Sequence, residues 1–198
     1  EDALEVLTEE RLVKVLEPAK NSAFGTEMLA RPRFYFAEQR IVENFQRLID
    51  SEAFTKFDAE RDLIASQENR LGIELDAVQL EAIHAALQNK VLIITGGPGT
   101  GKTTLVRFIL GLMSRRIPSV ALAAPTGRAA KRLTETTSYQ ASTIHRLLEA
   151  DNMGFQRNRD QPLESELLII DESSMIDTLL MDALLDAISS SARLVLVG

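Results

Sequence analysis

The chain has 198 residues, and its 22 Lys and Arg against 29 Asp and Glu give a formal net charge of -7. This acidic balance argues against a simple basic nucleic-acid-binding module, and a hydrophobic content of 45% argues against a disordered chain. Cysteine is absent, which excludes disulfides, cysteine-based zinc sites and cysteine nucleophiles and leads us to expect a cytoplasmic protein.

The first third of the sequence predicts a small, mainly helical segment. An apolar alternation over residues 11–16 predicts a short strand, and residues 21–25 are typical of a loop. Apolar residues at spacings of three and four predict a helix over residues 34–50, and residues 58–71 favour a second one. We therefore separate an N-terminal segment, residues 1–74, from the rest of the chain.

From residue 75 onward the pattern changes to alternating helices and strands. Asp76 and Gln79 form a capping-box pattern at the start of a helix, and residues 91–95 form an apolar, β-branched run. Such a run is typical of a strand buried on both faces of a parallel sheet. The alternation predicts an α/β domain with a parallel sheet over residues 75–198. Its other expected elements are helices at 102–114, 127–136, 143–150 and 177–188 and strands at 119–124, 167–170 and 193–197.

A phosphate-binding loop is the most specific motif. Residues 96–103 read GGPGTGKT and match the pattern G-x-x-x-x-G-K-[ST] between a predicted strand and a predicted helix. Backbone N–H groups of such a loop can surround phosphates, while the lysine reaches the β- and γ-phosphates of ATP and the hydroxyl ligates Mg²⁺. The candidate nucleotide-binding residues here are Gly97, Pro98, Gly99, Thr100, Gly101, Lys102, Thr103 and Thr104.

A pair of carboxylates follows the predicted strand 167–170. Asp171 stands at the end of that strand, where ligands of α/β proteins bind, and can hold Mg²⁺ together with Thr103. Glu172 can polarise an attacking water as a general base. A water-activating carboxylate favours hydrolysis over phosphoryl transfer to a small acceptor. The candidate catalytic residues are therefore Lys102, Asp171 and Glu172.

Two weaker segments suggest contact with nucleic acid. Both begin a predicted helix with hydroxyl-bearing residues, and both lie in residues 115–159, where eight basic and three acidic residues give a local charge of +5. Such a surface would bind the phosphate backbone irrespective of base sequence. A solvated helix face, a capping threonine and a packing histidine are the alternatives. The candidates are Pro125, Thr126, Gly127, Arg128, Ser142, Thr143 and His145.

The order of these motifs resembles the RecD-type superfamily 1 DNA helicases. The resemblance covers residues 76–198 and rests on GGPGTGKTT, APTGRAAKRL, ASTIHRLL, IIDESSMID and LVLVG, with Gln79 ahead of the loop. It implies a RecA-like P-loop domain in which Gln79 reads adenine, the candidate segments above touch single-stranded DNA, and ATP with Mg²⁺ drives movement from 5′ to 3′. The short spacer between APTG and STIH favours stand-alone members over the exodeoxyribonuclease V alpha subunit.

The same resemblance implies parts that these residues do not contain. The chain starts at Glu1 and stops at Gly198, where the third family motif begins, so we expect a truncated protein without the second RecA-like domain. An arginine from that domain typically contributes about 10³–10⁵ in rate, so we expect slow hydrolysis by residues 1–198 alone. Subunits of the RecB and RecC kind would be partners through the N-terminal segment, and we expect no membrane association.

Two alternatives remain compatible with the sequence. The chain could be a P-loop NTPase that acts on a substrate other than DNA, such as a nucleotide kinase. It could also be a non-catalytic module whose acidic N-terminal segment docks partner proteins, because residues 1–75 carry 10 basic and 16 acidic residues, a net charge of -6. Stimulation of ATP hydrolysis by DNA would separate these alternatives from the helicase interpretation.

Overall fold

The structure is a computed structural model that describes residues 13–16, 28–53, 56–57 and 61–198. Its centre is a sheet of five parallel strands in the order β3-β9-β8-β4-β5. This arrangement confirms the predicted α/β fold with a parallel sheet. The strands are β3 (Val91–Ile94), β9 (Arg193–Val197), β8 (Leu167–Ile170), β4 (Val120–Ala124) and β5 (Ala141–Thr143).

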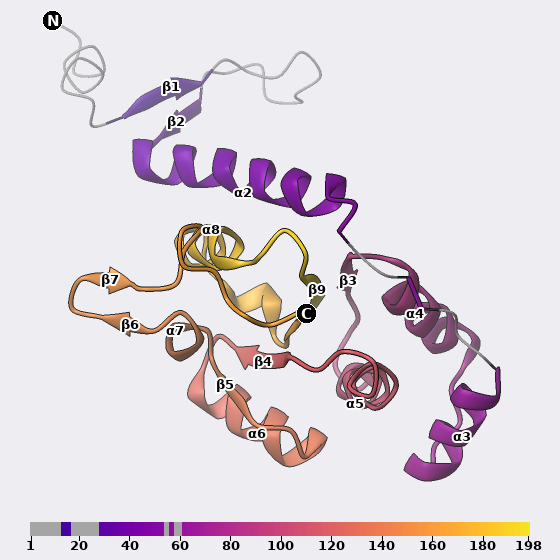
Figure 1. The fold of residues 1–198 in the computed structure, drawn as a ribbon. Coiled ribbons are helices and arrows are strands. Elements are labelled where there is room, and N and C mark those ends of the chain that lie inside the picture. Colours follow the sequence, from indigo (N-terminus) through magenta and orange to yellow (C-terminus); the bar gives the residue numbers. More distant parts are fainter. Residues whose placement is uncertain (1–12, 17–27, 54–55, 58–60) are drawn as a thin grey trace, which may run out of the picture.

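Helices cover both faces of the sheet (Figure 1). Alternate residues of a strand point to opposite faces, so Leu167 and Ile169 of β8 join one apolar cluster and Leu168 and Ile170 join the other. The first cluster includes residues of α3 (Arg61–Leu71), α4 (Ala77–Gln88), α5 (Lys102–Met113) and α6 (Gly127–Thr137), and the second includes residues of α2 (Pro32–Asp50), α7 (Ile144–Leu147) and α8 (Thr178–Ala187).

Within the described residues, no helix combines the length and apolarity needed to cross a membrane.

Most predicted elements are confirmed, because their start and stop signals are local. The Asp76 side chain accepts a hydrogen bond from the N–H of Gln79, and the Gln79 side chain accepts one from the N–H of Asp76, so the capping box of α4 is complete. Proline at the first helical position begins α2. Parts of three predictions lie outside the described residues: the start of the strand at 11–16, the loop at 21–25 and residues 58–60 of the second helix.

The sequence did not reveal several short elements. β1 (Lys14–Leu16) is the described part of the strand predicted over residues 11–16, but its antiparallel partner β2 (Met28–Ala30) was not predicted. The antiparallel pair of β6 (Ala150–Asp151) and β7 (Gly154–Phe155) was not predicted either. The helix expected over 143–150 is only the four-residue α7, because β5 precedes it and β6 follows it. A 3₁₀ turn, η1 (Ser173–Met175), follows Glu172. These elements have two to four residues, too few to produce a clear periodicity.

One expectation about the sheet is wrong. The apolar run ending at Thr95 predicted a strand buried on both faces, but β3 is at the edge of the sheet that the described residues form, and the Ile93 side chain is 58% exposed. An apolar run shows that a strand belongs to a parallel sheet. It does not show whether other elements cover both faces of the strand at its place in the sheet, which depends on residues far away in the sequence.

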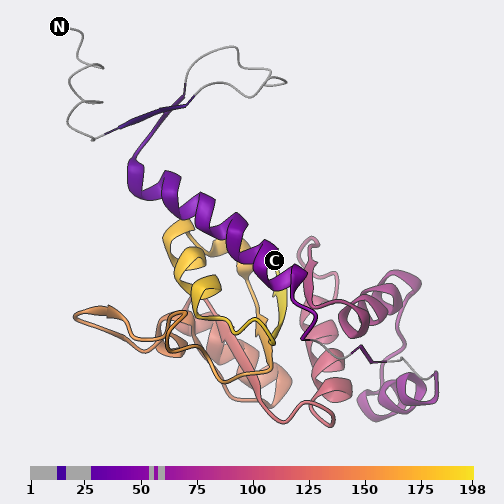
Figure 2. The same ribbon diagram turned by 45° about the horizontal axis from the view of Figure 1, so that its top comes forward.

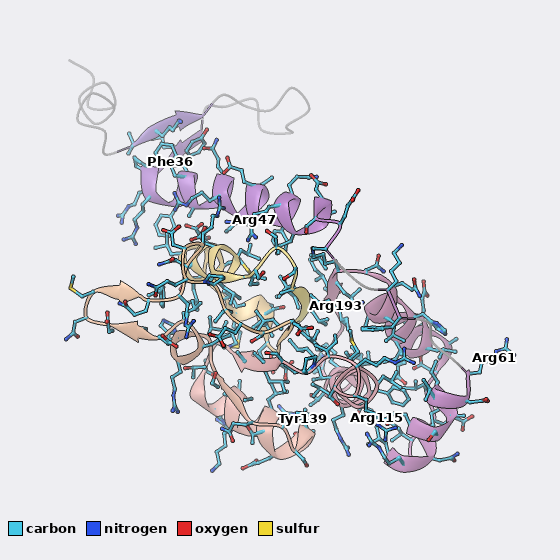
Figure 3. All side chains as sticks on the ribbon, in the orientation of Figure 1. Phe36, Arg47, Arg61, Arg115, Tyr139 and Arg193 are labelled. Atoms are coloured by element: carbon cyan, nitrogen blue, oxygen red, sulfur yellow. The ribbon has the colours of Figure 1, made fainter. Side chains whose placement is uncertain are left out.

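Polar contacts join helix α2 to helix α8. Helix α2 lies next to α8 in both views (Figures 1 and 2). The Arg40 guanidinium forms a forked pair with the largely buried Asp182 carboxylate, with an Nη2–Oδ2 distance of 2.5 Å. Arg47 points toward the C-terminal end of α8 (Figure 3), donating to the carbonyls of Leu185 and Ile188 at 2.9 Å each. A cation at a helix C-terminus satisfies carbonyls that lack partners within the helix.

We expect Arg40→Ala to lower the free energy of unfolding by about 1–2 kcal/mol, between the values typical of exposed and buried ion pairs. The loss arises because the Asp182 carboxylate remains buried without its cation. Urea denaturation measures it, and Glu38→Ala, on an exposed face of the same helix, is the matched control. A double-mutant cycle with Asp182→Ala should show coupling between the two residues; additive effects would contradict the assignment.

Candidate nucleotide site and nucleic-acid interface

The predicted phosphate-binding loop connects β3 to α5 at the carboxyl edge of the sheet. Gly99 and Gly101 have φ values of 79° and 83°, in the left-handed region that glycine adopts without strain. Gly101 is also the N-cap of α5, so the loop ends where helix N–H groups and the positive end of the helix dipole face outward. The geometry required for cradling phosphates is therefore present in this loop.

Lys102 lies folded over the same loop. Its ammonium group donates hydrogen bonds to the carbonyl oxygens of Gly96, at 2.5 Å, and Gly97, at 2.9 Å. Both acceptors are neutral, and phosphate oxygens would be stronger acceptors for a charged donor. Lys102 is thus held above the loop, where a triphosphate would be bound.

Asp171 and Glu172 stand at the end of β8, as expected. The Asp171 carboxylate accepts a hydrogen bond from the backbone N–H of Glu172 at 3.0 Å. Burial raises the pKa of Asp171 above its ordinary value of 3.8, while that hydrogen bond and the charges of Arg132 and Lys102 act in the opposite direction. Glu172 has a φ of 55°, and a non-glycine residue in this conformation is typical of strained functional sites.

The loop and the two carboxylates enclose one hollow of about 520 Å³. Thr103 and Asp171 both line it, and a hydroxyl with a carboxylate is an oxygen donor pair that suits Mg²⁺. Gly198 closes one side, since its N–H donates to the Ile94 carbonyl and its carbonyl accepts from Gly96. The sequence did not indicate two further residues of the lining, Arg132 and Ser174.

Gln79 lies on the other side of the loop. Besides its capping contact, its amide nitrogen is 3.5 Å from the Thr100 carbonyl oxygen, and it lines a second hollow of about 550 Å³. That hollow shares Thr100 and Lys102 with the first and adds apolar side chains such as Val78 and Ile93. The capping role of Gln79 is therefore present, and reading of adenine by Gln79 stays a prediction.

The two candidate nucleic-acid segments lie next to each other. β4 and β5 are parallel neighbours whose register places Ala124 opposite Thr143, so the two turns that follow them meet at the carboxyl edge. Thr126 caps α6, accepting from the Ala129 N–H at 3.2 Å, and Thr143 caps α7 in the same way. The segments bring together Pro125, Thr126, Gly127, Arg128, Ser142 and Thr143, with His145 exposed and its ring 5.7 Å from that of Phe155.

The expectation of one basic surface over residues 115–159 is wrong. Arg116 lies with Glu166 and Arg193 beyond the end of α5, at the amino edge of the sheet, whereas Arg128 is at the carboxyl edge. Arg115, labelled beside α5 in Figure 3, also follows the C-terminal end of that helix. Arg157 and Arg159 form ion pairs with Glu149, at 2.8 Å, and Asp186, at 3.3 Å. Summing charge along the sequence missed this division, because β4 runs from the amino edge of the sheet, near Arg116, to the carboxyl edge, near Arg128.

We expect Asp171→Asn to raise the thermal stability of the protein at pH 7.5 in a buffer without Mg²⁺. Burial makes the charged Asp171 carboxylate unfavourable, so its pKa is higher in the folded than in the unfolded chain. Below the unfolded pKa the group is protonated in both states and costs no stability. Above both pKa values it is charged in both states, and the full cost to stability is present. The gain in melting temperature over wild type should therefore shrink as pH falls toward 4. Asp177→Asn is the control, because asparagine caps α8 about as well as aspartate. A lower melting temperature for Asp171→Asn at pH 7.5 would contradict the inference.

Comparison with known proteins adds an independent finding. A family model described as an AAA domain matches residues 79–198. The ATP-dependent RecD2 DNA helicase of Deinococcus radiodurans is 42% identical over 124 residues, which cover 63% of this chain and 17% of that protein. The RecBCD enzyme subunit RecD of Mycobacterium tuberculosis is 38% identical, with coverage of 61% and 25%. The ATP-dependent DNA helicase dda of phage T4 is 33% identical, with coverage of 69% and 31%, so the chain spans less than a third of each relative's length.

Proposed function

Because the chain belongs to the AAA-domain family and, within it, to the RecD-type helicases, we propose that it is the nucleotide-binding motor domain of an ATP-dependent DNA helicase. The observation that carries this proposal is the shared carboxyl edge. The hollow beside Lys102, Asp171 and Glu172 lies along this edge of the sheet. The two turns after β4 and β5, each with a threonine that caps the following helix, lie along the same edge. We infer that single-stranded DNA binds across those turns while the hollow binds ATP.

The proposed chemistry follows from the residues of the hollow. Lys102 would leave the Gly96 and Gly97 carbonyls to bind the β- and γ-phosphates. Thr103 and Asp171 would hold Mg²⁺, which neutralises negative charge on the phosphates. Glu172 would accept a proton from the attacking water as general base. Gln79 would read adenine with the amide N–H and the oxygen lone pair that its contacts with Thr100 and Asp76 do not use.

The biological setting, the direction of movement and the partner subunits are proposed from the relatives. The relatives' names connect RecD proteins with the RecBCD enzyme, so recombination and repair of DNA are the proposed setting, with movement from 5′ to 3′. Partner subunits of the RecB and RecC kind would bind the N-terminal segment. We also propose the division between residues 1–74 and 75–198, although Leu48 and Ile64 of the first part pack in the two clusters beside the sheet.

The deciding experiment is ATP hydrolysis with and without single-stranded DNA, in the protein extended past Gly198 into a second motor domain. We expect stimulation by DNA that is lost in Lys102→Ala. Equal hydrolysis with and without DNA would contradict the helicase function and favour a P-loop enzyme with another substrate. If Lys102→Ala left every measurable activity intact, the N-terminal docking interpretation would be preferred.

A further inference from the structure

Arg132 lines the hollow proposed to bind ATP, whereas the first turn of its helix, α6, faces the proposed DNA surface. It belongs to the second turn of α6 and lines the same hollow as Lys102, Asp171 and Glu172. The hollow that contains Gln79 does not include it. Arg132 is therefore on the side of the loop where the two carboxylates stand, which is the side of the terminal phosphate.

The Arg132 side chain has no competing role within the part of the chain that the structure describes. Its guanidinium forms no hydrogen bond or ion pair with a described residue. Its neighbour Lys131, by contrast, is paired with Glu135 at 3.9 Å, and its side chain is 80% exposed. An arginine that lines a hollow holding a triphosphate can donate two parallel hydrogen bonds to phosphate oxygens.

The backbone that carries Arg132 is held firmly. The adjacent Leu133 is buried in the cluster that includes α5. The Thr134 hydroxyl donates to the Ala130 carbonyl at 3.0 Å and accepts from the Ala141 N–H at 2.9 Å, which ties α6 to β5. The same helix begins at the Thr126 cap, so one rigid element of 11 residues presents its first turn to the proposed DNA surface and its second turn to the nucleotide.

We propose that Arg132 binds the terminal phosphate of ATP from the helix whose N-terminus contacts DNA, and that α6 thereby couples DNA binding to hydrolysis. The coupling rests on the proposed function above, whereas the phosphate contact does not depend on DNA. Because α6 is one rigid helix, DNA bound at its first turn would fix the position of the Arg132 guanidinium relative to the phosphate. A side chain at this position would sense whether the third phosphate is present.

Nucleotide binding tests the phosphate contact. In the protein extended past Gly198, we expect Arg132→Gln to weaken binding of a non-hydrolysable ATP analogue about tenfold, as for loss of a charged hydrogen bond, and binding of ADP by much less. Arg132→Lys should recover part of the difference. Lys131→Gln removes the same charge from the same helix outside the hollow and should leave the preference for the analogue over ADP unchanged. Equal weakening of both nucleotides by Arg132→Gln, or of neither, overturns the proposal.

DNA measurements test the coupling. Arg132→Gln should reduce the fold-stimulation of ATP hydrolysis by single-stranded DNA while leaving DNA affinity without nucleotide unchanged. If DNA affinity falls instead and nucleotide preference is intact, Arg132 is a DNA contact and the proposal is wrong. If wild type shows no stimulation by DNA, the proposed helicase function and the coupling both fail, whereas the comparison of the ATP analogue with ADP still decides the phosphate contact.

Discussion

Replacing Lys102 with alanine should reduce ATP hydrolysis at least about 10²–10³-fold, the typical effect of removing a donor that stabilises charge developing in a transition state. The Lys102 side chain folds over the loop, and its ammonium group lies at hydrogen-bond distance from the Gly96 and Gly97 carbonyls. It is therefore already at the place where phosphate charge would need compensation. Steady-state hydrolysis with single-stranded DNA, in the protein extended past Gly198, measures the effect.

The structure also predicts that this loss is not caused by unfolding. Among the described residues, the Lys102 side chain bonds only to exposed loop carbonyls, and it belongs to neither apolar cluster, so the free energy of unfolding should change by less than about 0.5 kcal/mol. Lys131→Ala, which removes an exposed lysine outside the hollow, is the matched control. Retention of more than about a tenth of wild-type kcat/KM by Lys102→Ala would contradict the role assigned to the loop.

The parts of the fold that the sequence predicted well have local causes. The capping box joins Asp76 to Gln79, three positions away, and the loop glycines are required by their own φ values, so a short window of sequence contains the whole signal. The carboxylates at the end of β8 were predictable for a related reason, because the ends of parallel strands meet at one edge of a sheet. The nucleotide site could therefore be assembled from its motifs.

The parts that escaped prediction depend on residues distant in the sequence. The pairing of Arg40 with Asp182 joins positions 142 residues apart, and no local pattern marks either residue as a partner. The edge position of β3 depends on the order of strands that come later in the chain. Arg132 belongs by sequence to a basic group beside the DNA motif, yet its place in the hollow follows from the packing of α6 against α5 and β5. Long-range packing, rather than residue type, decided each of these.

Replacing Glu172 with glutamine should leave ATP binding intact and slow hydrolysis by about 10²–10⁴-fold, the usual contribution of a general base. Glutamine has nearly the same shape but cannot accept the proton of the attacking water. Lys102 would remain in the hollow to bind the phosphates, and Thr103 and Asp171 would remain to hold Mg²⁺. The enzyme extended past Gly198 should therefore be held in its ATP-bound state, and filter binding with labelled ATP should show a long-lived complex.

The backbone at Glu172 supplies a control that separates chemistry from stability. Its φ of 55° is unfavourable by about 1 kcal/mol for a side-chain-bearing residue, and glutamine keeps that strain whereas glycine removes it. Glu172→Gly should therefore unfold at a higher urea concentration than Glu172→Gln while being equally inactive. If Glu172→Gln hydrolysed ATP at the wild-type rate, the general base would have to be sought elsewhere along the hollow, and the left-handed turn after β8 would be a structural feature of η1 alone.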